Sequence, residues 1–163
     1  TVSRAHALAA IKIVMDNIEG LLCGKEEAHD AMAQGSMLAG LAFSNTRTTA
    51  CHSISYPLTM KYHIPHGVAV SMLLAPVMRL NLPYIKNSGE LFNAFGVQSV
   101  EELSEKVTSI LEKSGSPAKL SQWGAKEEDL PDLTAHSMTK GRADNNPAEL
   151  TAENVEEILK SVF

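Results

Sequence analysis

The sequence predicts an all-α fold, a helical bundle of about seven helices. Apolar residues recur at helical spacing through most of the chain, and no segment shows the apolar–polar alternation of a half-buried strand. Aromatic residues make up only 5% of the chain, whereas alanine, leucine, methionine and glutamate are common, which favours helix over sheet. At 163 residues the chain is long enough for its own core, so residues 1–163 are expected to form a single all-helical domain.

Two helices are expected before residue 44. The first begins after Ser3, a typical N-cap residue, and ends at Gly20 or Gly24. The second spans Lys25 to Phe43 and contains two glycines, which weaken a helix and therefore predict close contact with a neighbouring helix. The first helix starts abruptly and without an initiator methionine, so the chain is expected to begin within a longer protein.

The central part of the chain predicts a helical hairpin. A third helix runs from about Arg47 to Met60, and Pro57 inside it should kink the helix or remove some of its hydrogen bonds. The sequence His63-Ile64-Pro65 breaks this helix. Pro65 then opens a fourth helix to Leu80, whose side chains are nearly all apolar, so this helix is expected at the centre of the bundle.

The last part of the chain predicts four more helices separated by polar turns. Capping patterns mark two of them, at Ser99 and at Thr151, because each places a hydroxyl side chain just before a helical apolar repeat. The expected ranges are Tyr84 to Phe95, Val100 to Lys113, Lys126 to Thr139, and a final helix after Thr151 that runs to Phe163.

Charge and hydropathy exclude several kinds of partner. The net charge is −5 and no cluster of lysine or arginine is present, so neither nucleic acid nor anionic lipid is expected to bind. No apolar run reaches the roughly 18 residues of a membrane-spanning helix. Cys23 and Cys51 lack the spacing of a disulfide framework, which fits a reducing, cytoplasmic location.

Two histidines of the central segment are candidates for a metal site. His52 lies within the third helix and His66 on the first turn of the fourth, so a helix–break–helix hairpin can bring both imidazoles to one point. Neutral imidazole is a common ligand of divalent metals. Considered without any family, ordinary core or surface histidines are the commoner explanation, and a metal site is the alternative.

The segment H-S-I-S-Y-P-L-T-M-K-Y-H-I-P-H-G, from His52 to Gly67, resembles the signature of the iron-containing (group III) alcohol dehydrogenases. That signature has a histidine, then four residues later a histidine or tyrosine followed by Pro-Leu, and then Pro-His-Gly. The flanking segments Ala39 to Asn45 and Leu73 to Asn81 and the tail N-P-A-E-L-T-A-E-N-V-E-E-I-L are also similar to the family. The resemblance covers essentially the whole chain.

The resemblance implies a fold and a domain organisation. The chain should be the C-terminal helical metal-binding domain of this family, which has the dehydroquinate synthase-like fold, with His52 and His66 as metal ligands. In the family, an N-terminal α/β domain binds NAD or NADP, and an Asp-x3-His pair upstream supplies the other two ligands. This sequence has no glycine-rich strand–turn–helix, so it should be one half of a two-domain enzyme and inactive alone.

The resemblance also implies an activity, which is hydride transfer between NAD(P) and a small alcohol or aldehyde. The expected metal is Fe²⁺, with Zn²⁺ as the alternative, and it would polarise the substrate oxygen. Tyr56 stands where many members have histidine, and it can donate a hydrogen bond to that oxygen as a catalytic residue. Thr59 replaces a usual glycine, and Thr48 and Thr49 replace small apolar residues. Together with Tyr56, these departures indicate a subfamily with its own substrate, such as the polar or anionic aldehyde of phosphonoacetaldehyde reductases. The complete enzyme should be a homo-oligomer.

Two other classes of protein stay open. One is a metal-dependent non-redox enzyme of the dehydroquinate synthase type, and the other is a non-catalytic helical module that binds a partner. A stoichiometric metal would argue against the second class, because a binding module does not need one.

Three further sets of residues have the spacing of functional motifs but are expected to be ordinary surface groups. Asp132 and His136 repeat the Asp-x3-His spacing on the wrong side of the signature, so they should form a solvated pair. Glu26-x-x-His29 has the spacing of a di-iron motif, but that motif needs a second copy, which is not present. His63 is expected to be an exposed residue of the turn between the two central helices.

Overall fold

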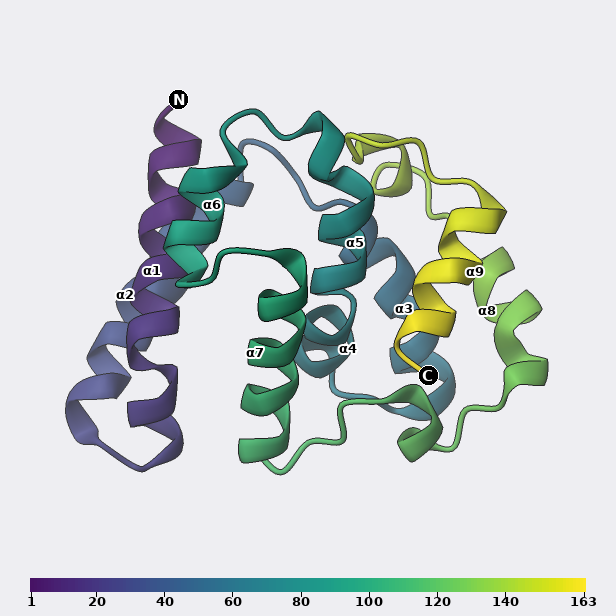
Figure 1. The fold of residues 1–163 in the computed structure, drawn as a ribbon, viewed down its shortest axis with the longest axis horizontal. Coiled ribbons are helices and arrows are strands. Elements are labelled where there is room, and N and C mark those ends of the chain that lie inside the picture. The colour runs from purple at the N-terminus through teal and green to yellow at the C-terminus, as the bar shows by residue number, and fades with distance from the viewer. The chain divides into compact units, whose positions relative to one another are not determined.

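The computed structural model describes all 163 residues and is all-helical, as predicted, with nine α-helices, four short 3-10 helices and no strand (Figure 1). None of the helices combines the length and the apolar character that crossing a bilayer requires. The α-helices are α1 (Val2–Leu22), α2 (Glu26–Phe43), α3 (Ala50–Tyr62), α4 (His66–Met72), α5 (Leu74–Asn81), α6 (Ser88–Phe95), α7 (Val100–Lys113), α8 (Leu130–His136) and α9 (Ala152–Ser161). The 3-10 helices are η1 (Leu82–Tyr84), η2 (Leu120–Trp123), η3 (Glu127–Asp129) and η4 (Ala143–Asn145).

The chain divides into two compact units. The first unit consists of Thr1–Arg47 and Lys86–Leu103, and the second of Thr48–Ile85 and Ser104–Phe163. The expectation of one domain over residues 1–163 stays a prediction.

The first unit is built around α1 and α2, which lie side by side along their length (Figure 1). The predicted close approach of α2 to a neighbour occurs at Gly35, which is buried. A Cβ atom at this position would lie 2.9 Å from Cγ2 of Val14 on α1. Helix α6 also packs on α1, and Arg4 forms an ion pair with Glu90 at 2.8 Å. Gly40 has open space around it, so only the first of the two glycines is explained by packing.

Replacing Gly35 by alanine is therefore expected to destabilise the protein by about 1 kcal/mol. Overpacking of a closed contact costs about 1–3 kcal/mol, whereas alanine recovers up to about 1 kcal/mol of helix propensity. Gly40→Ala is the matched control on the same helix, and it should stabilise the protein by about 0.5–1 kcal/mol because its methyl group meets nothing. Urea unfolding of both variants tests the pair, and the same sign for both would contradict the proposed contact.

The second unit is organised around α3, which contacts α4, α5, α8 and η4. Five residues of α3 are buried: Ala50, Ser53, Ile54, Ser55 and Leu58. Helices α4 and α5 carry the nearly continuous apolar stretch. Helix α5 is largely buried, as expected for the centre of a bundle, whereas only Ala69 and Met72 of α4 are buried. Helix α9 packs on α8 and α5 and closes this unit.

The single helix predicted from Pro65 to Leu80 is wrong, because the structure divides it into α4 and α5 at Leu73. The cause is Pro76, which has no N–H to donate to the carbonyl of Met72 and whose ring would collide with that carbonyl in an unbroken helix. Pro76 lies instead in the first turn of α5, where its lack of an N–H is tolerated. Pro57, in contrast, is accommodated inside α3, which continues to Tyr62.

Prolines and caps also set the other helix ends. The predicted helix from Lys126 to Thr139 is shorter, since α8 begins at Leu130 with Pro131 in its first turn. The first helix is capped by Thr1 instead of Ser3, through a hydrogen bond from the Arg4 N–H to the threonine hydroxyl at 3.3 Å. The two predicted capping patterns are present. The Ser99 hydroxyl accepts a hydrogen bond from the N–H of Glu102, and Thr151 is the N-cap residue of α9.

Candidate metal centre

The turn between α3 and α4 brings His52 and His66 together, as the hairpin predicted. His63 ends α3 in the left-handed conformation, with φ of 55°, and Pro65 precedes the first residue of α4. Ile64 between them is fully buried and anchors the turn. As a result, the centroids of the two imidazole rings lie 5.4 Å apart, with the ring planes tilted by 60°.

Tyr56 joins this pair, so the three expected site residues form one cluster. It lies four residues after His52 on α3, which places both side chains on the same face of that helix. The phenol ring stacks on the His66 ring, with 5.7 Å between centroids and 23° between planes. His52 and Tyr56 are half-buried and His66 is exposed, so the cluster is open to an incoming ligand.

The Ser55 hydroxyl contacts both histidines. It donates to the backbone carbonyl of His52 at 3.0 Å, and its oxygen lies 3.5 Å from Nδ1 of His66. Because the single hydroxyl proton is used by the carbonyl, the hydroxyl oxygen is placed to accept a hydrogen bond from the Nδ1–H of His66, an arrangement in which Nε2 is the nitrogen available to a metal. Fixing a ring in this way is the usual role of the outer partners of metal-binding histidines.

The surroundings of His52 favour its neutral form. Partial burial is the main cause that lowers its pKa below the ordinary value, and the nearby charges of His66 and Arg142 lower the pKa further. A lower pKa means that the ring is neutral at neutral pH, and only the neutral ring can bind a metal.

Arg142 is the residue of this cluster that the sequence analysis missed. It follows α8 in a polar segment that was expected only to form a turn, and its guanidinium carbon lies 4.7 Å from the centre of the Tyr56 ring. This distance is that of a cation–π contact. No local pattern could have found it, because the contact depends on how the segment after α8 folds back onto α3.

Two imidazoles alone do not complete a metal site. No group of three or more histidine, cysteine, aspartate or glutamate side chains is close enough to hold a metal ion. The donor set fits the family expectation that this chain supplies two nitrogen ligands and that a carboxylate and another imidazole come from elsewhere. Cys51, next to His52, is not a substitute ligand, because burial raises the pKa of its thiol to about 12.

The other residues with motif-like spacing behave as surface groups, as expected. Nδ1 of His136 lies 3.2 Å from the Asp132 carboxylate, and both side chains are exposed. Asp132 also pairs with Lys61 at 3.1 Å. His29 and His63 are exposed and lie in no cluster of metal-ligand side chains.

Lys61 connects α3 to the start of α8 and makes stability depend on pH. Its ammonium lies 2.8 Å from Asp129, and this contact, followed by the Lys126 N–H and Tyr62, lowers the pKa of Asp129 from 3.8 to about 2. A lowered pKa stabilises the folded state above pH 3.8, and this contribution is lost as the pH falls toward 2.

The free energy of unfolding of Asp129→Asn should therefore depend less steeply on pH over this range than that of the wild type, measured by circular dichroism. Asp30→Asn, an exposed carboxylate on α2, is the control, and an equal change in both variants would contradict the assignment.

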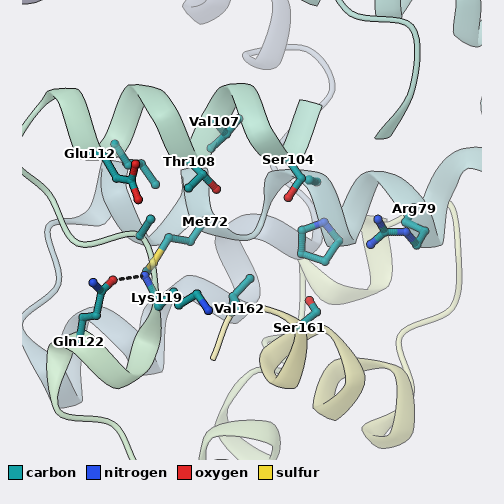
Figure 2. A pocket seen from close by; sticks show the side chains of 14 residues that line it. Met72, Arg79, Ser104, Val107, Thr108, Glu112, Lys119, Gln122, Ser161 and Val162 are labelled. Atoms are coloured by element: carbon teal, nitrogen blue, oxygen red, sulfur yellow. Dashed lines mark hydrogen bonds between the residues drawn. The ribbon is translucent and has the colours of Figure 1, made fainter. Parts of the chain in front are cut away.

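A cavity of about 360 Å³ lies elsewhere in the second unit, between α5, α7 and η2 (Figure 2). Met72, Val107 and Leu111 contribute apolar walls, and Glu112 and Lys119 are among its polar residues. The lining contains no histidine, no cysteine and none of the residues of the metal cluster. This cavity therefore lacks the nitrogen donors of a metal centre and is not the site of the chemistry that the hairpin predicts.

Comparison with known proteins agrees with this helical, histidine-bearing architecture. Residues 2–163 match the sequence model described as "Fe-containing alcohol dehydrogenase family, C-terminal". The chain therefore belongs to the iron-containing alcohol dehydrogenase family.

Particular relatives show how much of a family member this chain represents. It is similar to lactaldehyde reductase of Escherichia coli (strain K12), with 31% identity over 96% of this chain and 43% of the relative. Among solved structures, 1,3-propanediol oxidoreductase has a TM-score of 0.86 and 29% identity, over 100% of this chain and 46% of that one. Sulfoacetaldehyde reductase from Bifidobacterium kashiwanohense in complex with NAD⁺ has a TM-score of 0.83 and 27% identity, over 99% of this chain and 44% of that one. The chain thus spans less than half the length of these relatives.

Proposed function

We propose that this chain is the C-terminal metal-binding domain, residues 1–163, of an NAD(P)-dependent, iron-containing alcohol dehydrogenase or aldehyde reductase. The observation that supports the proposal is the convergence of His52, His66 and Tyr56 on one hairpin, at the segment that carries the family signature. The nucleotide-binding domain and the remaining metal ligands belong to the rest of the proposed two-domain enzyme.

The residues of the cluster have separate roles in this proposal. His52 and His66 would hold a divalent metal, Fe²⁺ or alternatively Zn²⁺, and the Ser55 hydroxyl beside Nδ1 of His66 would leave Nε2 of that ring as the metal-binding nitrogen. When bound, the metal supplies Lewis-acid polarisation of the substrate oxygen, while NAD(P) exchanges the hydride. The Tyr56 hydroxyl donates a hydrogen bond to the same oxygen, and its ring is held in place by His66 and Arg142.

The substrate class follows from the relatives. Their names refer to lactaldehyde, 1,3-propanediol and sulfoacetaldehyde, which are all short alcohols or aldehydes. We infer a short alcohol or aldehyde as substrate here. The proposal also places the complete enzyme in the cytoplasm, in line with two free thiols, and makes it a homo-oligomer, which light scattering can check.

One assay separates this proposal from the two other classes. The complete protein is freed of metal, reloaded with Fe²⁺ or Zn²⁺, and mixed with NADH or NADPH and a panel of short aldehydes. Metal-dependent oxidation of the nucleotide is the expected result. Stoichiometric metal without nucleotide oxidation would favour a non-redox enzyme, and the absence of stoichiometric metal would favour a helical interaction module.

A further inference from the structure

Arg142 is a cation without an anionic partner in this chain. Its guanidinium lies against the Tyr56 ring, and no carboxylate forms an ion pair with it. The nearest acidic residue in the sequence, Asp144, accepts a hydrogen bond from the backbone N–H of Gly141 at 2.6 Å. Arg142 is also half-buried, and a partly desolvated guanidinium gains most from a carboxylate, sulfonate or phosphonate, whose oxygens match its donors.

The segment that carries Arg142 is held in place on both sides of this residue. The buried hydroxyl of Ser53 on α3 accepts from the backbone N–H of Thr139 at 3.0 Å and donates to the carbonyl of Ser137. On the other side, the Asn145 amide donates to the carbonyl of Thr48 at 3.3 Å. A cation on such a fixed segment binds without first having to order its backbone, which favours recognition.

The charges around Arg142 favour an anion at this position. The Tyr56 ring contacts both the guanidinium and the His66 ring of the candidate metal centre. No carboxylate lies within ion-pair distance of the guanidinium to balance it, and a divalent metal at the two imidazoles would add positive charge. A molecule whose oxygen lies near the metal ligands and which carries an anionic group a few atoms away would contact both charges.

We propose that Arg142 is a substrate-specificity residue that binds the anionic group of a short aldehyde or alcohol. The inference rests on the proposed function and deepens it, since it names the class of substrate. Tyr56 lies between the two ends of that substrate, with its hydroxyl for the reacting oxygen and its ring supporting the guanidinium.

The experiment compares anionic and neutral aldehydes in the complete, Fe²⁺-loaded protein. The anionic panel is succinic semialdehyde, sulfoacetaldehyde and phosphonoacetaldehyde, and butanal is the neutral counterpart of the first. Arg142→Gln should lower kcat/KM for the best anionic aldehyde roughly 10- to 100-fold, the usual worth of a hydrogen-bonded charge, and should lower kcat/KM for butanal much less, by the smaller effect of losing the contact with the Tyr56 ring. Arg142→Lys should recover part of the loss. Lys140→Gln is the matched control, because it removes the same charge from an exposed position on the same segment.

A binding measurement removes the dependence on turnover. Calorimetry with 4-hydroxybutyrate and with butanol, in the absence of nucleotide, should show that Arg142→Gln weakens only the anionic ligand. Equal losses for butanal and the anionic aldehydes would mean a structural role for Arg142 and would overturn the inference. So would a rise in the KM for NADH or NADPH alone, since the anion would then be a phosphate of the cofactor. A wild-type protein that prefers butanal to every anionic aldehyde of the panel would also overturn the inference about Arg142. A wild-type protein that reduces no aldehyde would instead contradict the proposed function itself.

Discussion

His52→Ala and His66→Ala, each made in the complete protein, are expected to remove most of the bound metal and to lower activity more than about 100-fold. A four-ligand site loses its geometry with any single ligand, and even the outer partners of metal ligands are worth about 10- to 100-fold in affinity. The structure brings these two rings to 5.4 Å, so neither can be replaced by another donor of the chain. Elemental analysis and steady-state kinetics on the same samples measure both effects.

Two variants make this test specific. His136→Ala should retain metal and activity, because His136 is an exposed partner of Asp132. Tyr56→Phe should retain the metal but lower kcat roughly 10- to 100-fold, since it removes one hydrogen bond to the reacting oxygen. Equal metal content in wild type and His52→Ala would show that the histidine pair is not the metal site.

The isolated chain of 163 residues is expected to bind neither NAD⁺ nor NADP⁺ and to oxidise no alcohol. Dinucleotide binding uses backbone N–H groups around the pyrophosphate, usually from a glycine-rich turn between a strand and a helix, and this chain contains no strand. Calorimetry with each nucleotide, with and without Fe²⁺ or Zn²⁺, measures the binding. The control is the complete protein, which should bind one nucleotide under the same conditions. Saturable micromolar binding to the isolated chain would be incompatible with a half-enzyme.

Most helices were predictable because their signals are local. Hydroxyl caps at Ser99 and Thr151 act within a few residues, and the structure has them where expected. The errors also have local causes. The helices expected from Pro65 to Leu80 and from Lys126 to Thr139 include Pro76 and Pro131, and the lost hydrogen bond and the clash of the proline ring determine where α5 and α8 begin.

The candidate site was predictable only in part. The spacing along α3 and the turn before α4 were enough to predict that His52, Tyr56 and His66 lie close together, because these residues are near one another in the sequence. Arg142 reaches Tyr56 from a distant segment, through anchors at Ser53 and Thr48 that no periodicity encodes. Residues that only the tertiary structure brings together have no characteristic spacing in the sequence from which their contact could be predicted.

The two cysteines give each unit its own chemical reporter. Cys23 is exposed just after α1, in the first unit, whereas Cys51 is held in α3, in the second, with its thiol directed to the carbonyl of Leu73. With a pKa of about 12, the Cys51 thiol has almost no reactive thiolate near neutral pH until the helix opens. A maleimide followed by mass spectrometry would therefore modify Cys23 first. The rate of the slower modification, at Cys51, would then report how often the hairpin that carries both histidines opens, without any introduced label.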